Sequence, residues 1–525
     1  MLNETSSLPP DASAGPRLER RVLHHALLAW LVAAMVGLLV LAAGAASDLS
    51  LGDENYHFRK AALFAEYGCR LAYDPAYGPH VPPGIPYYDG WAWHAGLALL
   101  WRMLGQSVLV AQAYQAAWLV FLIGCAYMAG AALGGPRAGW GSLLAAATMP
   151  AALFFSAVLY TETAMLALLM AGIWLAARRR NLLGGLVFGL AFLVRPTVVM
   201  VFPAFLLAAV FLEGAGWRWR LRDALVLGLG AALLILPDLW WRYEHLGTVG
   251  VVFMSLSGGD SGIPAVIREM LREKGPATFY WSTSILNPLD VVMYVGPVIL
   301  FGLGLALARL RRGPRHRRVL WLALAVFAAA EGVLLLRRGV LDVRYAMAGF
   351  FLLVLIAGLA LADLTPGRRL AVRLFVAAAI LQGATVLGGV LWMRHLPPDA
   401  VREMRELGGL PDRRAPGFVV CPDAVVSTYS GKPILWAAIN PGPFFFTWPS
   451  EKQWFLLDYY GVQYIAVPRS RIYDDTAAKH TGGYPRSFVE ALPRMPYVDP
   501  FPVIDGPWMI VYRVKSKPAS EAPSR

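Results

Sequence analysis

The chain has 525 residues, of which 57% are hydrophobic and only 15% are charged. Soluble domains carry roughly 25% charged residues, so this composition excludes an ordinary soluble protein and indicates a membrane protein. The net charge of +13 also suits nucleic-acid binding, but the arginines gather between apolar runs, as the positive-inside rule requires of cytoplasmic loops. We therefore assign the charge to membrane topology and predict no nucleic-acid partner. The clusters are Arg17, Arg20 and Arg21; residues 178–180; Arg218, Arg220 and Arg222; residues 309–318; and Arg368, Arg369 and Arg373.

The first apolar run covers residues 26–46 and follows the basic cluster that ends at Arg21. A membrane-spanning helix needs about 20 apolar residues, and the apolar region of a signal peptide is usually shorter than this run. Because many more apolar runs follow, we predict an uncleaved first transmembrane helix. Residues 1–25 then form a cytoplasmic tail, and an outer loop covers residues 47–106.

The segment at residues 87–104 is apolar but contains Asp89, His94 and Arg102. If it crossed the membrane, every later arginine cluster would face outward, against the positive-inside rule. We therefore predict a juxtamembrane helix that lies along the outer surface, as amphipathic interfacial segments do.

The later apolar runs alternate regularly between the two sides and predict about eleven crossings in all. A long polar outer loop covers residues 242–287. The predicted spans are residues 26–46, 107–133, 140–160, 163–177, two short helices within 182–212, then 221–240, 288–308, 319–336, 345–363 and 370–392. Residues 26–393 are therefore predicted to form an all-α polytopic membrane domain.

A change of pattern follows at residue 394. Apolar runs shorten to strand length at residues 418–421, 463–467 and 508–514, and a helical stretch lies at 451–460. This alternation predicts a small α/β domain over residues 394–525, outside the membrane.

Two features of the outer segments leave alternatives open. Cys69 and Cys421 both fall outside the membrane, where they either pair or remain two buried thiols, whereas Cys125 lies within a span. The aromatic stretch at residues 444–448 suits a sugar-binding face or plain core packing.

The segment directly after the first span contains two adjacent carboxylates, Asp53 and Glu54, followed by His57. A carboxylate at the mouth of the membrane domain suits a general base that takes a proton from an acceptor hydroxyl. The alternative is a solvated loop in which Asp53 caps the following helix.

A second acid and two cations fall on the same side of the membrane. Glu162 follows Tyr160 and Thr161 at the outer end of the third span, where Thr161 is also a plausible helix N-cap. Arg195 stands before Pro196 at the tip of an apolar hairpin, and Arg344 stands before Tyr345 at the start of a later span. An arginine in such a place either holds a lipid phosphate through a bidentate contact or only anchors the helix end.

Several chemistry-bearing motifs are missing from the sequence: it has no Walker loop, no GxGxxG after a strand, no HExxH and no CxxC. Nucleotide hydrolysis, dinucleotide chemistry and zinc proteolysis are therefore disfavoured. Glu331 is the clearest charge within a span, and a proton-coupled transporter would need a chain of such groups.

The order and sidedness of these motifs resemble the GT-C superfamily of polyprenyl-phosphate-sugar-dependent glycosyltransferases, which includes protein mannosyltransferases and the aminoarabinose transferases of lipid A. The resemblance covers nearly the whole chain: the acidic pair Asp53-Glu54, the acid after the third span, Arg195-Pro196, Val343-Arg344-Tyr345 and the outer C-terminal domain.

A finer resemblance is to the α-1,2-glucosyltransferase that completes the eukaryotic lipid-linked oligosaccharide. The matching residues are Asp53-Glu54-Asn55-Tyr56-His57, Tyr73-Asp74-Pro75, Pro83-Gly84-Ile85-Pro86-Tyr87 and Tyr160-Thr161-Glu162. The chain departs from that family at Arg195-Pro196-Thr197-Val198, where the family has Arg-Gln-Thr-Asn. It also has Trp240-Trp241-Arg242 where oligosaccharyltransferases have Trp-Trp-Asp.

The resemblance implies an inverting transfer of one sugar from a polyprenyl phosphate to the hydroxyl of a lipid, glycan or protein. It implies Asp53 as the base, with Glu54 positioning or sharing it. It further implies that Arg195 and Arg344 hold the phosphate, while His57, Glu162 and Tyr345 line the sugar or acceptor site. No cofactor is obligatory, and related enzymes vary in their need for a divalent metal.

Two other classes of function compete with this prediction. A flippase for a lipid-linked sugar would have paired repeats and polar residues near mid-membrane. A nonenzymatic membrane scaffold would use the outer domain only to bind a partner. The acids and arginines on one face favour the enzyme. The Ala- and Arg-rich composition suits the inner membrane of a GC-rich bacterium, with the endoplasmic reticulum as the alternative.

Overall fold

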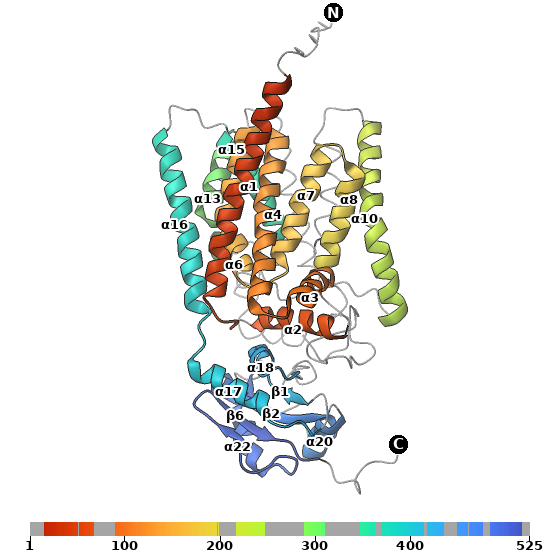
Figure 1. The fold of residues 1–525 in the computed structure, drawn as a ribbon, viewed down its shortest axis with the longest axis vertical. Helices are drawn as coiled ribbons and strands as arrows, with labels where there is room; N and C mark the ends of the chain where they lie inside the picture. The colour runs from red at the N-terminus through yellow and green to blue at the C-terminus, as the bar shows by residue number, and fades with distance from the viewer. Residues whose placement is uncertain are drawn as a thin grey trace, which may run out of the picture.

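The computed structural model describes residues 15–50, 52–67, 90–196, 198, 217–246, 288–309, 347–362, 369–413, 417–434, 449–459, 461–475 and 483–516. These residues form a bundle of long helices with a small domain, which contains a sheet, at one end (Figure 1). The prediction of a mostly helical domain with apolar spans, followed by a small C-terminal domain of mixed structure, is confirmed.

The bundle is built from ten described helices. They are α1 (Gly15–Ala45), α4 (Val108–Gly134), α5 (Pro136–Thr148), α6 (Pro150–Ala157), α7 (Glu162–Ala177), α8 (Asn181–Val194), α10 (Trp217–Leu246), α13 (Pro288–Arg309), α15 (Met347–Ala362) and α16 (Arg369–Met393). Within the described ranges, four helices are long and apolar enough to cross a membrane, or five if α5 and α6 form one bent span. The other predicted spans are represented by shorter apolar helices or lie outside the described residues, as 319–336 does. The total of about eleven crossings therefore stays a prediction.

The third predicted span, residues 140–160, is not one straight helix. It divides into α5 and α6, which meet at an angle of 54°. Met149, between them, has extended backbone angles of φ −61° and ψ 120°. Pro150 explains the break, because the proline ring disfavours a helical conformation in the residue before it. A new helix then starts with proline at its first position, where no backbone N–H is needed.

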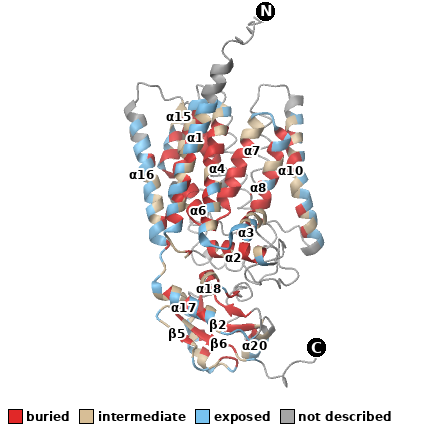
Figure 2. Cartoon of the chain, in the orientation of Figure 1, coloured by how far each residue is buried: buried red, intermediate tan, exposed pale blue. Residues whose placement is uncertain are grey.

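Burial separates the inner helices of the bundle from the outer ones. Of the 18-residue apolar window in each helix, 56% is buried in α4 and only 11% in α16. Figure 2 shows the same contrast between the buried residues of α4 and α7 and the exposed residues along α16. Exposed leucines on α1, α10 and α16 include Leu31, Leu229 and Leu381. In a membrane protein such surfaces face lipid.

Two short helices, α2 (Gly52–Tyr67) and α3 (Ala92–Leu104), lie side by side at the end of the bundle that carries the C-terminal domain (Figure 1). Helix α3 buries Trp93, Leu97 and Trp101, which recur at helical spacing along one face. It has 13 residues and is not among the candidate spans of the described chain.

The C-terminal domain contains a four-stranded mixed sheet in the order β1-β2-β6-β5. Strand β1 (Phe418–Val420) is parallel to β2 (Val462–Pro468), which is antiparallel to β6 (Met509–Arg513), and β5 (Ile504–Asp505) pairs with β6. All seven residues of β2 are buried, because apolar clusters cover both faces of the sheet. The three predicted strands correspond to β1, β2 and β6.

The remaining elements of this domain surround the sheet. They are α17 (Pro398–Gly409), α18 (Ala424–Ser430), α20 (Ser450–Tyr459), β3 (Ile472–Tyr473), β4 (Tyr484–Pro485) and α22 (Arg486–Ala491), with 3₁₀ turns at Arg469–Arg471 and Leu492–Arg494. Helix α18 faces the bundle and packs against α2 (Figure 1). Cys421, directly after β1, is a buried free thiol, whereas Cys69 lies outside the described residues.

Helices α8 and α10 pack backbone against backbone at two glycines. A Cβ added to Gly185 would lie 2.1 Å from the carbonyl oxygen of Leu227, and one added to Gly230 would lie 2.4 Å from that of Leu182. Small residues allow membrane helices to pack backbone against backbone in this way.

Gly185→Ala is therefore expected to lower the free energy of unfolding by about 1–3 kcal/mol, because the methyl group must force the two backbones apart. Gly228→Ala on α10 is the matched control. A Cβ there meets nothing within 4 Å, so alanine should be neutral or stabilise the helix by about 0.5–1 kcal/mol. Thermal unfolding in detergent would compare the two, and equal melting temperatures would contradict the close approach.

Candidate active site

The two adjacent carboxylates at the start of α2 have different environments. Acidic residues suit this first turn because they interact favourably with the helix dipole. Asp53 is partly exposed, whereas Glu54 is completely buried. Asp53 is therefore the more exposed of the two carboxylates, although both residues lie on the same helical turn.

Glu54 forms a bidentate ion pair with Arg394, the residue that follows α16. Its carboxylate oxygens lie 2.9 Å and 3.2 Å from Nη2 and Nε of the arginine. Both side chains are 0% exposed. The sequence analysis placed Arg394 only at a domain boundary and gave it no role. One signal was present: it is an arginine at the outer end of a span, where the positive-inside rule predicts few.

A chain of hydrogen bonds joins α2 to α3 through two histidines. The carbonyl oxygen of Gly90 lies 3.1 Å from Nδ1 of His94, so this nitrogen carries a proton and donates it. Nε2 of His94 then accepts from Nδ1 of His57, at 3.0 Å.

The environment of His94 favours the neutral form that this tautomer requires. Burial lowers the pKa of His94 well below its usual value, and the positive charge of Lys60 and the neighbouring His57 lower it further. Lys60 is itself completely buried, and its Nζ lies 5.5 Å from the centre of the Tyr56 ring. The sequence analysis did not single out this cation.

Glu162 and Arg195, predicted separately, are brought together between α7 and α8. Nη2 of the arginine lies 3.1 Å from Oε1 of the glutamate, with side-chain exposures of 7% and 0%. Thr161 was predicted as a possible N-cap, but its backbone is helical and its side chain makes no capping bond. Its hydroxyl accepts a hydrogen bond from Nη1 of Arg195 instead, at 3.1 Å.

Tyr160 links the two groups of residues. Its ring centre lies 5.8 Å from that of His57, in an edge-to-face arrangement. The backbone carbonyl of Tyr160 accepts a hydrogen bond from the side chain of Gln115 on α4. His57 on α2 is thus next to the chain segment that leads into Glu162.

The structure does not describe the remaining predicted site residues. Arg344 and Tyr345 lie outside the described residues, as do Thr197, the motifs at 73–75 and 83–87, and the aromatic stretch at 444–448. Among the described residues, no group of three or more His, Cys, Asp or Glu side chains could hold a metal ion.

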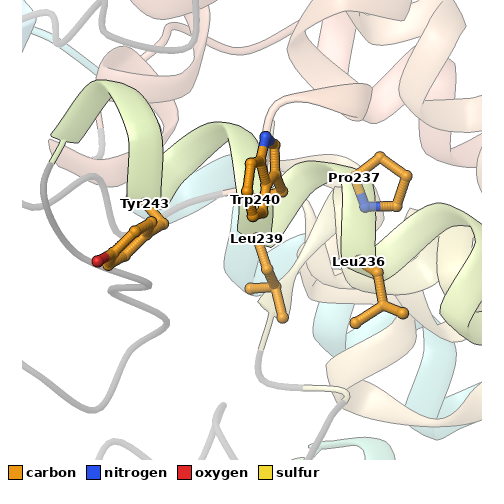
Figure 3. Close-up of a pocket in the computed structure, with 5 residues that line it drawn as sticks. All are labelled: Leu236, Pro237, Leu239, Trp240 and Tyr243. Atoms are coloured by element: carbon orange, nitrogen blue, oxygen red, sulfur yellow. The ribbon is translucent and has the colours of Figure 1, made fainter.

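The segment Trp240-Trp241-Arg242 lies near the end of α10. Arg242 forms a buried ion pair of 2.7 Å with Asp238, which also accepts a hydrogen bond from the Trp91 indole at 3.1 Å. These contacts fasten α10 to the start of α3. The opposite flank of this turn has an apolar groove of about 610 Å³ (Figure 3). Its lining residues, Leu236, Pro237, Leu239, Trp240 and Tyr243, all belong to α10, so the groove lies on the surface of a single helix.

Comparisons with known proteins place this fold among the GT-C glycosyltransferases. ArnT from Cupriavidus metallidurans in the apo state has a TM-score of 0.62 and 13% identity, over 93% of this chain and 98% of that chain. ArnT bound to undecaprenyl phosphate has a TM-score of 0.61 and 13% identity, over 93% and 97% of the two chains. The chain is therefore a multi-pass membrane protein that shares the fold of ArnT.

A second match is the archaeal oligosaccharyltransferase AglB from Archaeoglobus fulgidus, in complex with an inhibitory peptide and a dolichol-phosphate. Its TM-score is 0.58 with 14% identity, over 84% of this chain and 69% of that chain. No family model matches the chain. No curated protein matches it by sequence either.

The buried His94, hydrogen-bonded to His57, is expected to make the free energy of unfolding depend on pH. The unfolded protein binds a proton at His94 near its usual pKa of about 6.5, whereas the folded protein does so only at lower pH. The unfolded state therefore binds more protons below that value, and the free energy of unfolding falls as pH decreases from about 7.5 to about 5.5. His94→Gln should reduce this pH dependence of the melting temperature, because an amide can still donate to Gly90 and accept from His57 without titrating. An unchanged profile would show that His94 does not cause it.

The Glu162–Arg195 pair generates a second prediction. Arg195→Met is expected to destabilise the protein by about 3–5 kcal/mol, because it leaves the buried Glu162 carboxylate without its guanidinium partner. The double variant Glu162→Gln/Arg195→Met should recover most of that loss, since no buried charge then lacks its counterion. Thermal unfolding of the single and double variants tests the coupling. Additive effects would contradict it.

Proposed function

We propose that this protein is an inverting glycosyltransferase that moves a single sugar from a polyprenyl-phosphate donor to a hydroxyl acceptor. The observation that carries the proposal is an accessible carboxylate, Asp53, at the end of a GT-C bundle, next to a carboxylate that is locked in a buried ion pair. ArnT and AglB have been observed with undecaprenyl phosphate and dolichol-phosphate, and we extend this lipid class to the present chain.

The reaction follows from the chemistry of a glycosyl phosphate. The acceptor oxygen attacks the anomeric carbon as the bond to the phosphate oxygen breaks, and the phosphate leaves with the bonding electrons. Asp53 takes the proton of the attacking hydroxyl. Attack opposite the leaving group inverts the anomeric configuration. A phosphate is already a good leaving group, so the enzyme needs positive charge beside it more than an acid.

The other site residues divide into positioning and binding roles. Glu54 positions the first turn of α2, because both its oxygens contact Arg394. Arg195 and Arg344 are proposed to hold the phosphate, Arg195 doing so beside Glu162, its ion-pair partner. His57, Glu162 and Tyr345 are proposed to line the sugar or acceptor site. The acceptor class, whether lipid, glycan or protein, is left to experiment.

The proposed arrangement in the cell follows the charge pattern of the sequence. Residues 1–25 lie in the cytoplasm, residues 26–393 form the membrane domain with about eleven crossings, and residues 394–525 lie in the periplasm of a bacterium. The catalytic loop at 47–106 then faces the periplasm, which is where Asp53 would meet its substrates.

The test is sugar transfer from radiolabelled polyprenyl-phosphate sugars in proteoliposomes. Asp53→Asn is expected to lower transfer by about 10²–10⁴-fold, because the amide cannot accept the proton. Its melting temperature should stay close to that of the wild type, since Asp53 is partly exposed. Glu66→Gln, at the exposed far end of the same helix, is the matched control and should transfer normally.

Two results would contradict parts of the proposal. Transfer by Asp53→Asn at the wild-type rate would remove Asp53 from the base role. If the wild type consumed no donor while labelled lipid still crossed the bilayer, a flippase would replace the glycosyltransferase.

A further inference from the structure

The guanidinium of Arg394 contacts four separate groups at the junction of the two domains. A guanidinium has five N–H groups in a fixed planar arrangement. Nε donates to Oε1 of Glu54 at 3.2 Å, and Nη2 lies 2.9 Å from Oε2 of the same carboxylate as an ion-pair contact. Nη1 donates to the Ser47 hydroxyl at 2.8 Å and to the Ala157 carbonyl at 2.9 Å. Nη2 also reaches the amide oxygen of Gln112 at 3.1 Å, in the amide orientation that satisfies both ends of that side chain.

These partners come from separate parts of the membrane domain. Ser47 follows α1, Glu54 begins α2, Gln112 is on α4 and Ala157 ends α6. Arg394 itself connects α16 to the C-terminal domain. The side chain therefore joins the ends of α1, α2, α4 and α6 to the end of α16, and the guanidinium is completely enclosed among them.

The backbone around Arg394 holds the chain between α1 and α2 as well. The amide of Asp48 donates to the carbonyl of Arg394 at 2.8 Å, and the Asp48 carboxylate accepts from the amide of Leu396 at 3.0 Å. The amide of Leu49 donates to the hydroxyl of Tyr429 on α18 at 3.1 Å. The Asn55 side chain donates to the carbonyl of Leu49 at 3.0 Å. The residues on both sides of Asp53 are thus fixed to the C-terminal domain and its linker.

We propose that Arg394 is a positioning residue for the transfer reaction: it sets the orientation of the first turn of α2, and hence of Asp53, and makes the docked C-terminal domain part of the active site. This inference rests on the proposed function. Asp53 and Glu54 are successive residues of one helical turn, so a rotation of that turn about the helix axis moves both side chains together. Because the planar guanidinium of Arg394 contacts both oxygens of Glu54, it opposes this rotation and thereby fixes the direction of the Asp53 side chain.

The physical reason for arginine at this place is its shape. A lysine would keep the charge, but its donors radiate from a single atom and cannot contact four separate acceptor groups across a planar fork. Displacement of a reacting group by about 1 Å costs on the order of 10²-fold in rate. The loss of the fork should therefore affect the rate of transfer much more than the binding of the donor.

The first experiment compares kcat and KM for the radiolabelled donor in Arg394→Lys and the wild type. We expect kcat to fall by about 10–100-fold and KM to change by less than about threefold. Arg402→Lys is the matched control. It alters an ion pair with Asp399 on α17 whose side chains are 66% and 48% exposed, so its kinetics should equal those of the wild type. A wild-type kcat in Arg394→Lys would overturn the inference.

A second variant separates positioning from simple loss of fold. Glu54→Leu/Arg394→Met replaces the buried ions by apolar side chains of similar volume, an exchange that is often neutral for stability. We expect this double variant to melt near the wild-type temperature and still to show the reduced kcat. Native melting together with native kcat would show that the pair is only structural.

A third measurement is independent of activity. Asp53→Cys is introduced with and without Arg394→Lys, and its alkylation by a membrane-impermeant maleimide is timed, with the labelling of the native cysteines subtracted. Glu66→Cys at the other end of α2 is the control. We expect Arg394→Lys to change the labelling rate at position 53 by more than about threefold and to leave position 66 unchanged. If the wild type transfers no sugar but this shift appears, the proposed function fails and the positioning role stands. If position 53 were labelled at the same rate with and without Arg394→Lys, the positioning role of Arg394 would be overturned.

Discussion

The ion pair between Glu54 and Arg394 determines how the outer end of the membrane domain is assembled. Burying two charges is costly, and their attraction compensates only when the geometry is good and the remaining donors are satisfied. Here the guanidinium is paired with the Glu54 carboxylate and donates as well to Ser47, Ala157 and Gln112. The C-terminal ends of α1 and α6 and the N-terminal ends of α2 and α4 must therefore lie where those bonds require, and α18 packs against α2.

This constraint explains how adjacent carboxylates of the same chemical type acquire different roles. Glu54 is enclosed and neutralised by Arg394, whereas Asp53 stays partly exposed. A helix turns about 100° per residue, so fixing one side chain inward directs its neighbour along a different face. The same reasoning applies to α7 and α8, where Arg195 both neutralises Glu162 and fixes Thr161. In each case a buried arginine is paired with a glutamate in the first turn of a helix.

Much of the fold could be predicted from the sequence, because apolar runs and arginine clusters are local signals. The strands at 418–421, 463–467 and 508–514 were also evident, since short buried runs between turns are local. The role of Arg394 was not predictable, because it depends on a contact between residues 340 positions apart. The pairing of His94 with His57 escaped prediction for the same reason. Pro150 did carry a local signal for the break between α5 and α6, and the sequence analysis overlooked it.

The position of Arg394 directly after α16 has a consequence for the membrane itself. The apolar run of α16 extends from Leu374, directly after Arg373, to Met393 and has 20 residues, which at 1.5 Å per residue is about 30 Å long. This equals an average hydrocarbon core of about 30 Å. A thicker bilayer would pull the end of α16 inward or force the lipid to thin around it, and either strain would act first on the guanidinium at that end. A change in the acyl-chain length of the surrounding lipid would therefore be transmitted through Arg394 to the first turn of α2.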